Sequence, residues 1–136
     1  MPRALTAYLK RADVPDRKAL QDAIGALGLP LTLDDAYAPF ATQGYLPCTL
    51  DGEDAGFDLR FTDTGAGIPP APVDARGARD TALRCKGSGD PREDAAAAIV
   101  CAALAESVGA LVREGETETP LSSAQLIARA RSAMVD

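Results

Sequence analysis

Hydrophobic and polar positions follow strand-like or helix-like spacing in short segments along the first part of the chain. Residues 4–10 fit either a strand or a helical turn, and Thr6 and Tyr8 favour the strand. From residue 16 to residue 27 apolar side chains recur every three or four positions, which predicts an amphipathic helix. Gly28 is expected to end this helix, because glycine readily adopts the left-handed conformation of a helix C-terminus.

The segments that follow predict strands and a tight turn. Leucine at every second position of residues 29–34 indicates a short, half-buried strand, and residues 35–44 indicate a loop. Residues 45–50 and 55–62 are strand-like runs on either side of an Asp-Gly pair, which is a strong hairpin signal. In the second run Phe and Leu alternate with Asp, Arg and Thr, so one face of the hairpin is expected to meet the core.

The second half of the chain predicts a long loop, two strands and two helices. Residues 63–79 hold several glycines and prolines and are expected to form the loop. Residues 81–86 and 110–114 are strand-like and flank the strongest predicted helix, residues 90–108, whose first positions carry the Asp, Pro and Glu of a capped start. A last helix is predicted after Ser122, which suits the N-cap position.

These elements predict an α+β fold in one domain, residues 1–136. The expected order is β-α-β-β-β-β-α-β-α, with a mixed, mostly antiparallel sheet of five to six strands packed by three helices. Strands that are grouped away from helices favour this class over a doubly wound parallel sheet.

Composition narrows the range of functions. The chain has 14 Lys and Arg against 20 Asp and Glu, a net charge of −6, and no histidine. Without imidazole, Ser-His-Asp triads and histidine-dependent zinc sites are excluded, so the chain is expected not to be an enzyme and to use no cofactor or metal. The negative charge argues against nucleic acid as a partner, because such binding depends largely on Lys and Arg.

Two further features bear on location. The longest apolar run, residues 95–105, is 11 residues long, shorter than the ~20 residues that a membrane-spanning helix needs. Residues 1–13 already carry Lys10, Arg11 and Asp13, so we do not expect them to form an export signal. A cytoplasmic protein that does not enter a membrane is therefore expected.

The three cysteines allow two interpretations. Cys48, Cys85 and Cys101 form no Cys-x-x-Cys pair and lie in apolar or strand-like segments, which predicts buried free thiols in a reducing compartment. In the alternative, the charges of Arg84 and Lys86 would lower the pKa of Cys85 and make it a reactive nucleophile.

Acidic side chains gather at the predicted hairpin and at the start of the long loop. A negative surface of this kind attracts a basic protein and accelerates association with it. The residues predicted to bind such a partner are Asp51, Glu53, Asp54, Asp58 and Asp63.

A glycine-rich turn before the long helix offers a second possibility. Backbone N–H groups and the helix dipole attract anions at such turns, although neither the dinucleotide-binding nor the P-loop pattern is complete here. The alternative function is therefore a small-molecule or anion-binding domain that uses the turn from Gly87 to Arg92, with Arg84, Lys86, Ser88 and Arg92 as ligands.

Four segments of the chain are similar to a loose group of short bacterial cytoplasmic proteins. They are GYLPCTLDG at residues 44–52, GFD at residues 56–58, Gly89-Asp90, and the helical EDAAAA at residues 93–98. Several members of that group are encoded beside secreted toxins and are regarded as immunity proteins. The resemblance extends from about residue 29 to the last helix and rests on a hairpin and a capped helix. It implies a non-enzymatic inhibitor of a toxin. Together with the charge of −6 and the lack of histidine, it leads us to expect an immunity protein that blocks the active site of a cognate toxin, and the toxin is expected to have a basic surface.

Overall fold

The computed structural model describes residues 4–34, 37–38, 41, 43–63, 81–87, 90–114 and 121–134. Its helices are α1 (Arg17–Ala26), α2 (Pro91–Val108) and α3 (Ser123–Met134), with a short 3₁₀ helix at Arg11–Asp13. Its strands are β1 (Leu5–Leu9), β2 (Leu31–Leu33), β3 (Gly44–Leu46), β4 (Cys48–Leu50), β5 (Glu53–Asp54), β6 (Phe57–Asp63), β7 (Thr81–Lys86) and β8 (Leu111–Glu114).

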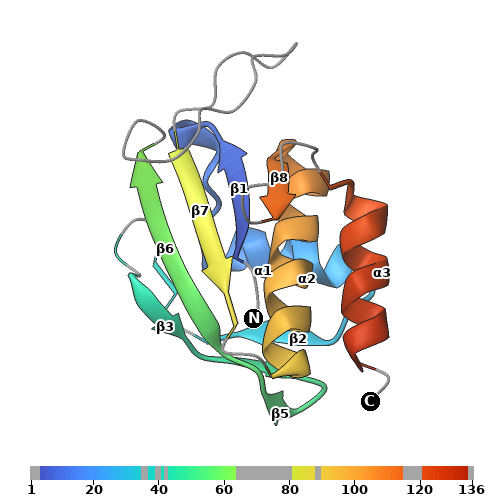
Figure 1. The fold of residues 1–136 in the computed structure, drawn as a ribbon. Helices are drawn as coiled ribbons and strands as arrows, with labels where there is room; N and C mark the ends of the chain where they lie inside the picture. Colours follow the sequence, from blue (N-terminus) through green and yellow to red (C-terminus); the bar gives the residue numbers. More distant parts are fainter. Residues whose placement is uncertain are drawn as a thin grey trace.

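Five strands form the larger sheet, in the order β3-β6-β7-β1-β8 with antiparallel neighbours throughout. Figure 1 shows β6, β7 and β1 side by side, with α2 and α3 lying next to each other and antiparallel beside them. Because side chains alternate along a strand, each strand presents one set to α2 and the other set to the opposite side. We call that opposite side the outer face of the larger sheet.

Helix α2 forms the centre of the core. It contacts β1, β6, β7 and β8 as well as both other helices, and its residues from Ala95 to Leu104 are all buried. Six of these ten are alanines, whose small side chains allow the sheet and two helices to approach one helix closely. Among the described residues no helix has the length and apolar character of a membrane span.

The predicted helix boundaries are set by capping residues. The Asp16 side chain accepts a hydrogen bond from the Ala19 N–H at 2.8 Å, and the Asp90 side chain accepts one from the Arg92 N–H at 2.8 Å. At the start of α3, Ser122 and Gln125 exchange hydrogen bonds in a capping box. Gly109 ends α2 with a φ of 68°, a conformation that favours glycine.

Strands β3 to β6 are one long hairpin that bends between two sheets. The pairs Tyr45 with Asp58 and Thr49 with Asp54 keep the same register along the whole hairpin. Beyond the bend, β4 and β5 join β2 in a three-stranded sheet of order β2-β4-β5. Pro47 and Gly56 lie opposite one another at the bend, where proline supplies no N–H to the ladder and glycine no side chain.

The α+β class and the predicted order of strands and helices are confirmed. The described residues form eight strands, whereas five or six were predicted. The bend divides the run 45–50 into β3 and β4, and β5 forms beside the turn. The strand favoured at residues 4–10 is present as β1. Apart from Asp63, the last residue of β6, the predicted loop 63–79 lies outside the described residues.

Candidate functional site

The three-stranded sheet is held against α1 by side chains that complete its outer edge. Gln21 donates to the Leu31 carbonyl and accepts from the Leu33 N–H, both at 2.8 Å, and so takes the place of a neighbouring strand. Arg17 donates to the carbonyl oxygens of Leu33, at 2.8 Å, and of Asp34, at 3.3 Å. An otherwise open strand edge is thereby closed.

A groove of about 390 Å³ lies over this sheet. Thr32, Thr49 and Asp54 come from one cross-strand row of β2, β4 and β5, so their side chains share one side of the sheet. Arg17 and Asp34 also line the groove. The groove is therefore a polar concavity with two carboxylates, large enough to receive a long side chain of another protein.

The predicted hairpin turn is present and is the most exposed acidic feature of this region. Asp51 and Gly52 both have positive φ, 54° and 83°, as a two-residue type I′ turn requires. The Asp51 N–H donates to the Pro30 carbonyl at 2.8 Å, which ties the turn to the chain before β2. Residues 51–54 are all exposed.

Strand alternation separates the predicted acidic residues. Glu53 forms an ion pair with Arg92 near the start of α2, and Figure 1 places β5 close to that end of the helix. Asp54 is turned to the opposite side of the hairpin and lines the groove. Asp58 lies on the same side of the hairpin as Asp54. The two are four positions apart in a strand that keeps one register, and side chains an even number of positions apart point to the same side.

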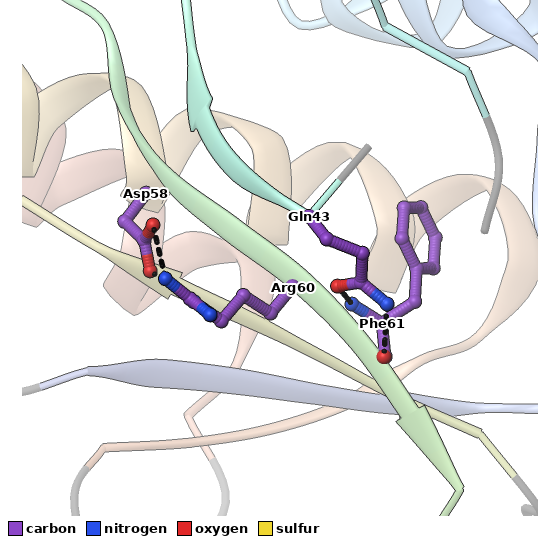
Figure 2. Close-up of polar contacts among 4 residues, drawn as sticks. All are labelled: Gln43, Asp58, Arg60 and Phe61. Atoms are coloured by element: carbon purple, nitrogen blue, oxygen red, sulfur yellow. Dashed lines mark hydrogen bonds and ion pairs between the residues drawn. The ribbon is translucent and has the colours of Figure 1, made fainter. Parts of the chain in front are cut away.

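Asp58 reaches the outer face of the larger sheet and is paired there. Its carboxylate accepts hydrogen bonds from Arg60 Nε at 2.9 Å and Nη2 at 3.4 Å (Figure 2). This contact raises the pKa of Arg60 through the hydrogen bond and the charge of Asp58. Asp63 ends β6, and its side chain lies outside the described part of the chain.

Tyr45 is a site residue that the sequence prediction missed. It is 64% exposed, although it is large and aromatic, and it lies opposite Asp58 in the ladder. Its ring covers the backbone of Gly56, since a Cβ on Gly56 would collide with the ring and lie 2.8 Å from the Leu46 carbonyl oxygen. The sequence did contain one signal for this exposure: Tyr45 is next to Leu46, which is buried, so alternation along the strand turns Tyr45 to the other side.

Figure 2 also shows how Gln43, the residue before β3, is held against β6. The Gln43 amide donates to the Phe61 carbonyl and accepts from the Phe61 N–H, both at 2.8 Å. The side chain thus extends the β3-β6 ladder by one more pair of hydrogen bonds. We define the hairpin surface as the residues on the exposed side of this bent hairpin: Tyr45, Pro47, Thr49, Asp54 and Asp58.

The predicted anion ligands that the structure describes lie on two elements, β7 and the first turn of α2. Arg84 and Lys86 are exposed on the outer face, whereas Arg92 pairs with Glu53. Ser88 lies outside the described residues. The turn also faces a carboxylate: a Cβ on Gly87 would lie 2.6 Å from Asp94 Oδ1, and burial, with the charges of neighbouring acids, raises the pKa of Asp94.

All three cysteines are buried free thiols, as predicted. Arg84 and Lys86 point to the outer face, while Cys85 between them points to α2, so their charges do not activate it. A hydrogen bond to Cys101, together with burial, instead raises the pKa of Cys85. Burial raises the pKa of Cys48 to about 12. The alternative interpretation, in which Arg84 and Lys86 lower the pKa of Cys85, is therefore wrong.

Within the described ranges no three Cys, Asp or Glu side chains gather in an arrangement that could hold a metal ion. Comparison with known proteins adds no relative: no protein-family model, curated protein or solved structure matches the chain. The candidate site therefore rests on the geometry and charge of the hairpin surface and the groove beside it.

Proposed function

We propose that this protein is a cytoplasmic, non-enzymatic binding protein that neutralises a cognate protein toxin by covering its active site. The contact is made by the hairpin surface and the groove beside it. The observation that carries this proposal is an exposed aromatic side chain, Tyr45, on the same side of a bent hairpin as Asp54 and Asp58.

The composition of this surface supports protein binding. Tyrosine is among the residues that contribute most to interface energy, because it buries a large rigid area and also offers a hydroxyl. The groove beside it is lined by two carboxylates, Asp34 and Asp54, and by one cation, Arg17. Its excess of negative charge matches a Lys or Arg side chain of a basic partner. The carboxylates also accelerate encounter with such a partner through long-range attraction.

The resemblance to immunity proteins supports the choice of a toxin as partner. Its characteristic segments at residues 44–52 and 56–58 form the two strands that pair at the bend and carry the hairpin surface. Blocking by shape and charge requires no catalytic group, in agreement with the absence of histidine.

The test uses the product of the gene adjacent to the one that encodes this chain as the partner. Tyr45→Ala and Asp54→Lys are each expected to weaken the complex by at least about tenfold, or about 1.4 kcal/mol, as measured by calorimetry. Both residues are exposed, so the variants are expected to fold.

Asp22→Lys is the matched control, because it makes the same change in charge at an exposed position of α1. It is expected to leave affinity nearly unchanged. Equal losses for Asp22→Lys and Asp54→Lys would mean that net charge alone drives association, and no binding by the unaltered chain would overturn the proposal.

A further inference from the structure

A row of basic side chains crosses the outer face of the larger sheet. Arg60 on β6 lies opposite Arg84 on β7, Arg84 lies opposite Thr6 on β1, and Thr6 lies opposite Arg113 on β8. Lys86 belongs to the same face. Four cations and the single carboxylate of Asp58 thus give the described part of this face a charge of +3, whereas the whole chain carries −6.

This arrangement is unfavourable without a counter-charge. Like charges directly opposite one another on neighbouring strands destabilise a sheet. Asp58 relieves Arg60 through its ion pair at 2.9 Å. No ion pair joins Arg84 to a described residue, and its side chain is exposed.

Arg113 is already oriented by its surroundings. Its guanidinium lies 5.5 Å from the centroid of the Tyr8 ring, within the range of a cation–π contact. Its Nε is buried and has no hydrogen-bond partner among the described residues. A buried donor that lacks an acceptor is costly, and a rotation of the guanidinium towards an anion at the surface would supply the acceptor.

Thr6 completes the arrangement between the two arginines. It is only 8% exposed, although it points away from α2. Neighbouring strands are ~4.8 Å apart, so Arg84 and Arg113 begin ~10 Å apart on either side of Thr6. Side chains as long as arginine can converge from that separation on one small anion above the threonine.

We propose that Arg84, Thr6 and Arg113 form a binding site for an oxyanion, a phosphate or carboxylate group, on the outer face of the larger sheet. Guanidinium groups bind both kinds of oxyanion in bidentate geometry. This site differs from the turn at Gly87, and none of its three residues belongs to the hairpin surface.

The test measures amide and arginine Nε–H chemical shifts by NMR while the protein is titrated with one of two probes. The first is inorganic phosphate, and the second is a short peptide of alternating glutamate and alanine. The unaltered chain is expected to show saturable shifts at Thr6, Arg84 and Arg113, which weaken as salt is added. Saturation by phosphate alone identifies a phosphate ligand, and saturation by the peptide alone identifies an acidic side chain of a partner.

Variants separate a built site from general attraction. Arg84→Gln is expected to weaken binding at least about fivefold, whereas Lys18→Gln, an equal change of charge on exposed α1, leaves it unchanged. Arg113→Lys keeps the charge but removes the Nε–H donor, and it is expected to weaken binding as well. Absence of saturable shifts with both probes, or equal loss in Arg84→Gln and Lys18→Gln, would overturn the site. Asp54→Lys leaves this binding intact, so failure here is distinguishable from failure of the toxin contact.

Discussion

Replacing Leu83 by alanine is expected to lower the free energy of unfolding by about 2–5 kcal/mol, whereas replacing its neighbour Arg84 changes it by less than about 0.5 kcal/mol. Leu83 is fully buried in β7, between β1 and β6, on the side that faces α2. Truncation there removes apolar contacts and leaves a cavity in a core that is closely packed with alanine. Arg84→Ala removes only an exposed side chain that opposes Arg60.

Urea-induced unfolding of the two variants and the unaltered chain measures this difference. The pair is informative because the two positions are adjacent in sequence and point to opposite faces of the sheet. Similar losses of stability in both variants would contradict the register of β7 on which the outer face depends.

Alkylation of the native thiols at pH 8 is expected to be slower than alkylation of the unfolded chain by a factor on the order of 10³ or more. Burial raises the pKa of Cys48 to about 12, so very little thiolate is present at that pH. A hydrogen bond to Cys101 and burial also raise the pKa of Cys85. Folding therefore favours the protonated form of both thiols. Their contribution to the free energy of unfolding is present below about pH 8.5, the pKa in the unfolded chain, and is lost as the pH rises towards the pKa in the folded state.

Iodoacetamide labelling, followed by mass spectrometry of each cysteine-containing peptide, measures these rates. All three thiols are expected to remain protected until urea unfolds the chain. Rapid labelling of Cys85 alone in the native protein would contradict the conclusion that this thiol is unreactive. It would favour the alternative in which Cys85 is a nucleophile.

Local signals predicted most of the fold. Asp16, Asp90 and Ser122 cap helices that begin where apolar periodicity begins, and the Asp-Gly pair at residues 51 and 52 adopts the turn that its chemistry favours. These features depend on residues within a few positions of each other. They are therefore visible in a single sequence.

The features that the sequence did not predict depend on pairing between distant segments. The bend that divides one hairpin between two sheets requires Pro47 to face Gly56, and the row from Arg60 to Arg113 requires four strands in a particular order. Strand order follows from long-range packing rather than local preference.

The candidate site was predicted in part, for the same reason. Alternation along the hairpin turns Glu53 towards α2 and Asp54 towards the groove, so one acidic cluster in sequence became two groups in space. Tyr45 was visible in the pattern, but its exposure depends on its ring lying over Gly56 across the hairpin. The acidic residues could be predicted from the sequence, but the side of the hairpin to which each side chain points could not.

Titration of the adjacent gene's product with this protein, while the activity of that product is followed, tests the central claim most directly. We predict stoichiometric inhibition that ends at one molecule of this chain per molecule of partner and that is lost in the Tyr45→Ala, Asp54→Lys double variant. Complete inactivation by a small fraction of an equivalent would show turnover and contradict a binding protein, as would an activity that is unchanged at every ratio.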